Sequence, residues 1–189
     1  LETAQIAIQA SLTGHLVFST VHTNDAAGGI TRLVEMNVEP FLVASSLIVL
    51  LAQRLVRKIC PECKKTRPPT PEEVARLGYT LEEFTAQGGR DHGFKDAKRP
   101  PPPPGMVYAA NGCPACLDTG YAGRAGIFEL LMVDEEVRNL VLKNTDAATM
   151  KKLAVKRGMR TLRQDGAQKV IAGWTTIEEV MRVTAEDAG

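Results

Sequence analysis

The stretch Cys60-Pro61-Glu62-Cys63 is matched later in the chain by a second one, Cys113-Pro114-Ala115-Cys116. These two stretches contain all four cysteines of the protein. In each stretch a two-residue spacer lets one tight turn present both sulfur atoms to a single point. Two such turns supply four soft ligands, which is the closed tetrahedral set that a structural zinc ion prefers.

The same spacing is also typical of thiol oxidoreductases, so a dithiol reductase is an alternative interpretation. One motif would leave that choice open, but two matching motifs that use every cysteine favour zinc. We therefore predict a zinc ion bound by four ligands: Cys60, Cys63, Cys113 and Cys116. Four protein ligands leave no position for a water molecule, so the metal is expected to hold structure and to do no chemistry.

The composition excludes several classes of function. The 189 residues include 23 basic and 22 acidic side chains, which gives a net charge of +1 and no electrostatic basis for nucleic-acid binding. The hydrophobic fraction of 44% suffices for a packed core. The longest apolar run, residues 41–52, is too short to span a bilayer. Thiols that act as metal ligands indicate a reducing, cytoplasmic compartment.

The first segment, residues 1–58, is predicted to be α/β. Apolar residues run together over 15–21, as in a strand that is buried on both faces. We expect a helix before this strand, a second helix capped by Asn24 or Asp25, and a long core helix from Pro40 to Leu55. Because one strand cannot form a sheet, the remaining strands are expected to precede Leu1.

His22 lies one residue beyond the end of the predicted strand. Ligands bind at this edge of open α/β sheets, so the polar cluster of residues 22–25 is a candidate site. The alternative is that Asn24 and Asp25 are only helix caps and that His22 is an ordinary loop histidine.

The interval between the cysteine pairs is expected to be rich in loops. It contains a helix that begins near Thr70, five consecutive prolines over residues 100–104 and a short strand over 106–110. The proline run is a stiff spacer or a ligand for proline-reading domains. After the second cysteine pair we expect a glycine-rich turn over 119–126 and a strand over 127–131.

The tail is expected to contain four short amphipathic helices. Their predicted caps are Asp134, Asp146, Thr161 and Thr175. The chain is therefore divided into an α/β segment (1–58), a tetracysteine subdomain with a proline-rich insertion (59–131) and a helical carboxyl-terminal subdomain (132–189).

Several of these stretches resemble the secretion ATPases of bacterial type II secretion and type IV pilus assembly. The similarity lies in residues 1–7, 13–25 and 52–56, in the second cysteine motif with residues 119–131, and in residues 158–166 and 175–180. It fails across about 68–104. Residues 32–36 and 39–42 look more like the type II secretion branch.

The resemblance implies the end of a RecA-like P-loop ATPase domain, with the inserted zinc subdomain and helical tail already described. The parent protein would be a cytoplasmic homohexamer at the inner membrane that binds ATP and Mg²⁺, contacts the inner-membrane secretion platform and drives pseudopilus assembly. His22 matches the family's "His box" histidine near the terminal phosphate. Leu1 would fall just after the Walker B region.

The sequence contains no G-x-x-x-x-G-K-[ST] motif, so this chain alone is expected to be inactive as an ATPase. Two alternatives remain open: a type IV pilus assembly ATPase, and a non-enzymatic zinc-binding interaction module with no ATPase parent.

Overall fold

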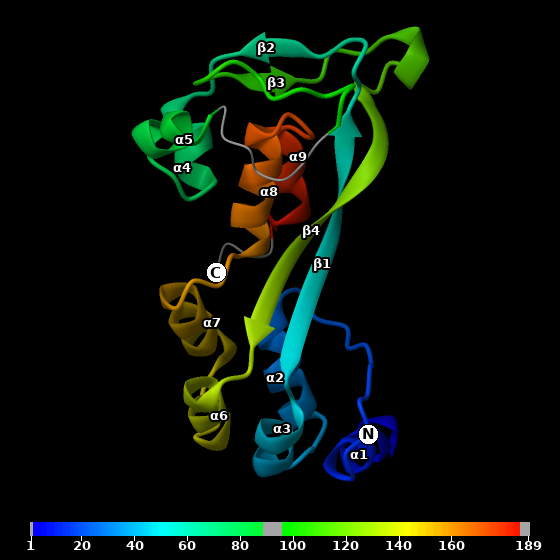
Figure 1. Cartoon of the computed structure of the whole chain (residues 1–189), viewed down its shortest axis with the longest axis vertical. Helices are drawn as coiled ribbons and strands as arrows, with labels where there is room; N and C mark the ends of the chain where they lie inside the picture. Colours follow the sequence, from blue (N-terminus) through cyan, green and yellow to red (C-terminus); the bar gives the residue numbers. More distant parts are fainter. Residues whose placement is uncertain (1, 89–95, 186–189) are drawn as a thin grey trace. The chain divides into compact units, whose positions relative to one another are not determined.

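The computed structural model describes residues 2–88 and 96–185, which form two compact units (Figure 1). Of the described residues, 2–52 and 128–161 form the first unit, and 53–88, 96–127 and 162–185 form the second. Two long strands, β1 (Val49–Ile59) and β4 (Tyr121–Met132), pair with each other and run in opposite directions. The boundary between the units crosses both strands, so each strand contributes to both cores.

The first unit packs helices against the ends of these strands. It contains α1 (Glu2–Leu12), α2 (Ala26–Glu35), α3 (Pro40–Ser46), α6 (Glu135–Leu142) and α7 (Ala147–Lys156). Helix α3 packs on α1 and α6, and α2 packs on α7. Ile30 and Val43 are among the most deeply buried side chains here. The expected mixed α/β class is therefore confirmed.

The predicted strand over 15–21 is wrong. These residues are irregular, and Leu16 and Phe18 are 73% and 89% exposed. A strand is held by hydrogen bonds to a neighbouring strand, and no other segment within residues 2–88 and 96–185 pairs with this one. The apolar run alone therefore does not make a strand.

The predicted long helix from Pro40 to Leu55 is also wrong. Helix α3 ends at Ser46, and the chain then enters β1. Residues 47–51 are rich in Leu, Ile and Val, and such short apolar runs suit a buried helix and a strand equally well. Pairing with β4 decides in favour of the strand. Its residues Leu51 and Leu55 are about half exposed, so they are not core.

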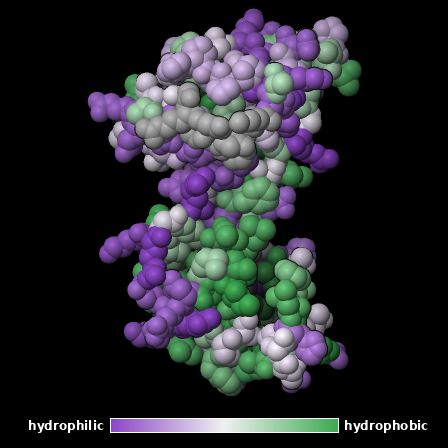
Figure 2. Space-filling view, viewed as in Figure 1, coloured by the Kyte–Doolittle hydropathy of each residue, from purple (hydrophilic) through white to green (hydrophobic). Residues whose placement is uncertain are grey.

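Apolar side chains gather on the face of the first unit that Figure 2 presents. On β4 the alternation places Ile127, Glu129 and Leu131 inside, whereas Phe128, Leu130 and Met132 are about half exposed. Over residues 127–132 both faces of the strand are thus apolar except for one buried carboxylate, Glu129. Exposed apolar surface of this kind is typical of a region that other protein covers.

The second unit contains a small antiparallel sheet of β2 (Lys65–Arg67) and β3 (Val107–Ala109), with Thr66 opposite Tyr108. The strand expected over 106–110 is therefore confirmed. The single helix expected near Thr70 is instead two, α4 (Pro71–Arg76) and α5 (Leu81–Gln87). Thr70 and Thr80 each open one with a complete capping box. The spacing of the apolar residues is that of one continuous helix, but the capping box at Thr80 starts a new helix.

The proline run, residues 100–104, packs against the rest of the second unit, and we call it the strap. Pro102 is buried, and the hydroxyl of Tyr108 donates a hydrogen bond to the carbonyl of Pro100 at 3.1 Å. Gly173 has a positive φ of 78°, and a Cβ there would lie 2.6 Å from the Pro100 carbonyl oxygen. Only glycine permits this close approach.

The four helices of the tail are confirmed, and two of them, α8 (Leu162–Ile171) and α9 (Ile177–Val183), belong to the second unit. Asp134 and Asp146 cap α6 and α7 as expected. The cap of α9 is Thr176, one residue later than predicted, and its hydroxyl accepts a hydrogen bond from Glu179 N–H. The expected partner at the third position, Glu178, instead pairs with Arg67. The glycine-rich turn over 119–126 is shorter than expected, because β4 begins at Tyr121.

A buried carboxylate joins α9 to β1 within the second unit. The Glu179 side chain is fully buried and accepts hydrogen bonds from the backbone N–H and the guanidinium of Arg57 at 2.8 to 3.0 Å. Arg182 donates two more. Burial opposes ionisation, but the hydrogen bonds from Arg182 and Arg57 outweigh it and lower the pKa of Glu179 to about 2. Glu179 is therefore a charged anchor for this helix.

We predict that Glu179→Gln lowers the free energy of unfolding by about 1–3 kcal/mol at neutral pH, because hydrogen bonds to a charged partner are lost. Since the folded pKa lies below the unfolded value, the contribution of Glu179 is present above about pH 4.5 and lost as the pH falls toward 2. Urea unfolding between pH 3 and 7 measures this difference. The control is Glu82→Gln on the exposed side of α5. A wild-type-to-variant difference that stays constant with pH would contradict the assignment.

Candidate metal centre and the His22 segment

The four cysteines converge in the second unit. Cys60 directly follows β1, and Cys63 lies in the turn that leads to β2. Cys113 is the N-cap of the short 3₁₀ turn Pro114–Cys116, and Cys116 is the last residue of that turn, which precedes β4. All four Sγ atoms lie within 4.8 Å of one another. Each motif thus forms a tight turn, and the fold brings the two turns face to face.

The spacing of the sulfur atoms fits a tetrahedral ion. The Sγ atoms of Cys60 and Cys113 are 3.9 Å apart, those of Cys63 and Cys116 are 3.8 Å apart, and those of Cys113 and Cys116 are 3.7 Å apart. A metal at about 2.3 Å from four tetrahedral sulfur ligands places those sulfurs about 3.8 Å from each other. All four cysteines are free thiols. The donor set therefore fits a zinc ion without rearrangement.

Backbone N–H groups point at one of the sulfurs. The Sγ of Cys116 accepts hydrogen bonds from Gly120 N–H at 3.2 Å and from Cys113 N–H at 3.3 Å. Burial opposes ionisation of Cys116, but these N–H groups outweigh it and lower its pKa to about 6. Burial raises the pKa of the Cys113 thiol to about 12. One thiolate is thus stabilised by the fold itself, and a bound cation would be needed to stabilise the others.

The two turns are also joined through the backbone. Cys60 N–H donates a hydrogen bond to the carbonyl of Gly120 at 2.9 Å. Gly120 has a φ of 75°, and a Cβ at this position would lie 2.6 Å from the Cβ of Ala110. A residue without a side chain is therefore required where the chain that leaves the second turn passes the chain that enters it.

The cations near the first pair are engaged by other groups. The sequence places Arg57, Lys58, Lys64 and Arg67 around Cys60 and Cys63, where they could offset the charge of a tetrathiolate. In the structure Arg57 pairs with Glu179, Lys58 with Asp96, and Arg67 with Glu73 and Glu178. Lys64 lies over the ring of Tyr108. Their direct role is to tie segments of the second unit together.

Arg99 is a supporting residue that sequence reasoning missed. Its buried guanidinium donates hydrogen bonds to the carbonyls of Ile59 at 2.7 Å and Ala122 at 2.9 Å, which flank the cysteine turns. It also pairs with Asp96, and Lys58 and Arg99 together hold the pKa of that carboxyl well below its usual range. An arginine before a proline run gives no sequence signal of this role.

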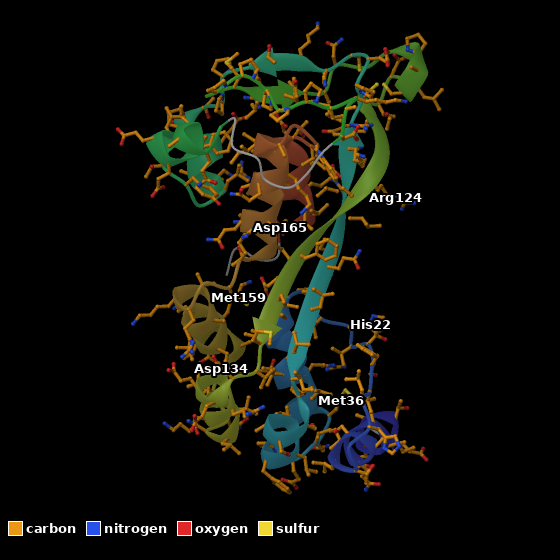
Figure 3. The ribbon with its side chains drawn as sticks, viewed as in Figure 1. His22, Met36, Arg124, Asp134, Met159 and Asp165 are labelled. Atoms are coloured by element: carbon orange, nitrogen blue, oxygen red, sulfur yellow. The ribbon has the colours of Figure 1, made fainter. Side chains whose placement is uncertain are left out.

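His22 lies in the first unit, on the irregular segment between α1 and α2 (Figure 3). Its side chain is exposed, so the structure leaves it accessible to a ligand. Asp25 is the N-cap of α2, as one interpretation of this cluster predicted, and its Oδ1 accepts a hydrogen bond from Gly28 N–H at 2.8 Å. His22 therefore stands three residues before a firmly capped helix.

Two carboxylates and a lysine gather at the start of α2. The buried Glu129 of β4 accepts a hydrogen bond from Ala26 N–H at 3.0 Å. The Lys151 ammonium of α7 lies 2.9 Å from Asp25 Oδ2 and 3.8 Å from Glu129 Oε2. Because Asp25 and Glu129 already accept hydrogen bonds from N–H groups of the first turn, this helix end is not arranged as a phosphate site. A lone Glu inside the apolar run 127–131 is a sequence sign of a buried carboxylate, but it does not identify Asp25 and Lys151 as its neighbours.

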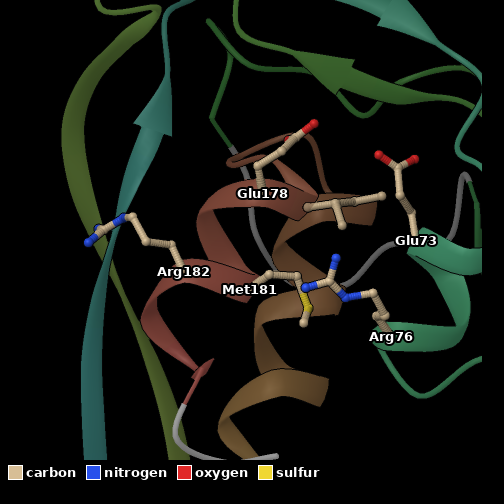
Figure 4. A pocket seen from close by; sticks show the side chains of 6 residues that line it. Glu73, Arg76, Glu178, Met181 and Arg182 are labelled. Atoms are coloured by element: carbon tan, nitrogen blue, oxygen red, sulfur yellow. The ribbon is translucent and has the colours of Figure 1, made fainter.

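A hollow of about 350 Å³ lies on the second unit between α4 and α9 (Figure 4). It is lined by Glu73, Arg76, Ile177, Glu178, Met181 and Arg182. Glu73 and Glu178 both pair with Arg67, and Arg182 pairs with Glu179. Most of the charges around the hollow are therefore neutralised by the protein itself, which does not indicate a binding site. Among the described helices, none is long and apolar enough to cross a membrane.

The sequence is similar to those of secretion and pilus assembly proteins. The chain is 47% identical over 185 residues to the type IV pilus assembly ATPase PilB of Thermus thermophilus, a match that covers 98% of this chain and 19% of that protein. It is 45% identical over 187 residues to the type II secretion system protein E of Aeromonas hydrophila, covering 99% of this chain and 33% of the relative. The chain thus spans about a fifth to a third of the length of these relatives.

A solved structure shares the fold. The pilus retraction motor PilT with bound ADP matches with a TM-score of 0.56 and 23% identity, over 97% of this chain and 36% of that one. A model of the type II/IV secretion system protein family matches residues 1–182. From its amino-terminal helix almost to its end, this chain belongs to the type II/IV secretion system protein family.

Proposed function

We propose that this chain is the carboxyl-terminal part of a secretion ATPase that hydrolyses ATP to drive pseudopilus assembly in type II protein secretion. The observation that carries the proposal is the family match over residues 1–182, joined to relatives whose names describe them as pilus assembly ATPases and secretion system proteins. The resemblance of residues 32–36 and 39–42 favours the type II branch. The type IV pilus branch is the alternative, and the relatives come from both.

The motor chemistry needs parts that other regions of the whole protein would supply. Phosphoryl transfer to water requires a glycine-rich loop with its lysine, a magnesium ligand and a group that orients the attacking water. This sequence contains no such loop. ATP and Mg²⁺ would be held upstream, and the chain would contribute His22 at the terminal phosphate. Its exposed side chain and its position before the capped α2 support that role.

The exposed apolar residues of the first unit support a larger parent. Phe18, Phe128 and Leu130 are 89%, 43% and 50% exposed. We infer that other strands and helices of the same RecA-like domain cover these residues in the whole protein. A homohexamer that contacts the inner-membrane secretion platform from the cytoplasm is the assembly that the family resemblance implies.

For the four cysteines we propose a structural zinc ion. A bound zinc would join Cys60 and Cys63, which follow β1, to Cys113 and Cys116, which precede β4. The chemistry that it supplies is the stabilisation of four thiolates. A dithiol reductase is disfavoured because the four sulfurs form one cluster with tetrahedral spacing, not two separate pairs.

We predict about one zinc ion per chain, measured by elemental analysis of the purified protein. Cys113→Ser should lose the zinc and increase hydrogen exchange across residues 58–131, because the metal contributes folding free energy. Helices α6 and α7 of the first unit should keep their protection. The matched control is Ala115→Ser, an exposed spacer in the same turn. Full exchange protection after a chelator has removed the metal would refute the structural role.

ATP turnover is expected to need the whole protein and His22. The whole protein should hydrolyse ATP, residues 1–189 alone should not, and His22→Ala in the whole protein should lower kcat by about 10- to 100-fold because a group at the developing charge is lost. His15→Ala, an exposed histidine before the same segment, is the control and should retain wild-type turnover.

A whole protein without turnover would exclude the ATPase and leave the zinc-binding interaction module. Wild-type turnover in His22→Ala would remove His22 from the site.

Genetic complementation decides the branch. The whole protein is expressed in a strain that lacks its secretion ATPase and in a strain that lacks its pilus ATPase. Rescue of pilus assembly alone would overturn the type II assignment.

A further inference from the structure

At the start of α2, two carboxylates from different elements share one lysine. Asp25 comes from the His22 segment, Glu129 from β4 and Lys151 from α7. Here the His22 segment means residues 21–25, which join the irregular stretch to α2. Each of the three side chains is at least four-fifths buried, and Glu129 is fully buried.

The position of Glu129 requires charge compensation. A fully buried carboxylate is costly unless it is paired and hydrogen-bonded. It accepts a hydrogen bond from Ala26 N–H, and Lys151 Nζ lies 3.8 Å from its second oxygen. The same ammonium lies 2.9 Å from Asp25 Oδ2. The Lys151 ammonium thus offsets the negative charge of both carboxylates at the helix end.

The cluster holds the carboxyl end of the His22 segment in place. Asp25 caps α2 with one oxygen and binds Lys151 with the other. Thr23 donates its hydroxyl hydrogen to the Asp25 carbonyl at 3.0 Å, which shapes the two residues that connect His22 to the cap. The segment is therefore held by three elements at its carboxyl end, whereas Leu16 and Phe18, which precede it, are largely exposed.

We infer that Lys151 is a positioning residue for His22: it fixes the end of the His22 segment through Asp25 and Glu129, and so makes turnover depend on the tail helix α7. The inference rests on the proposed ATPase function. Lys151 does not touch the nucleotide in this assignment. Its effect reaches the reacting phosphate through Asp25 and the backbone of residues 22–25.

The test uses the whole protein with Lys151→Met, which keeps the length of the side chain and removes its charge. We expect kcat to fall by about tenfold, the usual scale for lost positioning, while KM for ATP changes by less than about twofold. Lys152→Met is the matched control, because Lys152 is the next residue on α7 and is exposed. Lys151→Arg should restore most of kcat, since it keeps a cation within reach of both carboxylates.

A double-mutant cycle with Asp25→Asn separates positioning from general destabilisation. Asparagine is as good an N-cap as aspartate but cannot hold the ammonium by charge. If Lys151 acts through Asp25, the double variant should lose no more kcat than the worse single variant. Independent, multiplicative losses would overturn the inference, as would equal kcat in Lys151→Met and Lys152→Met.

Hydrogen exchange supplies a readout besides activity. Amides of residues 23–28 should exchange faster in Lys151→Met than in wild type, and should not change in Lys152→Met. Faster exchange with unchanged kcat would make Lys151 purely structural and overturn the inference. If the wild-type protein has no turnover, the proposed function fails. In that case the exchange comparison alone decides whether Lys151 holds the His22 segment. Exchange of residues 23–28 that is the same in Lys151→Met and wild type would show that it does not.

Discussion

The structure of the second unit depends on a cluster of four cysteine sulfur atoms that lies at the ends of two strands. Cys60 directly follows β1, and Cys116 lies shortly before β4. The cluster therefore holds together the end of the paired strands β1 and β4. Backbone and side-chain contacts are built around that closure: Cys60 N–H bonds to Gly120, and Arg99 binds the carbonyls of Ile59 and Ala122. The unit has a small sheet and short helices, and a metal or disulfide commonly compensates for such a limited core.

Among the described residues, each unit has one fully buried glutamate, and both glutamates accept hydrogen bonds in the same way. Glu179 accepts the backbone N–H of Arg57 and pairs with arginines, whereas Glu129 accepts the backbone N–H of Ala26 and lies near Lys151. In both, a carboxylate joins a strand to a helix that is distant in sequence. Such contacts are directional, so they fix how an element docks, which apolar packing alone leaves loosely specified.

The features that could be predicted from the sequence are those with local causes. The cysteine turns, the caps at Asp25, Asp134 and Asp146, and the short strand at β3 follow from spacing and side-chain chemistry within a few residues. The errors concern elements that depend on distant partners. Residues 15–21 lack a neighbouring strand in the described chain, and residues 49–55 become a strand only because β4 pairs with them. The Asp25–Glu129–Lys151 cluster joins three separate elements, which no local pattern contains.

The strap formed by the proline run affects how this region can diversify. Arg99 and Pro102 fix the chain just before β3, and Thr66 then meets Tyr108 in a register that those anchors set. The register of the small sheet and the approach of the chain to Cys113 are therefore fixed by the residues between Arg99 and β3. A change in the length of the proline run would shift both, so the run is the part of this region least free to vary in length.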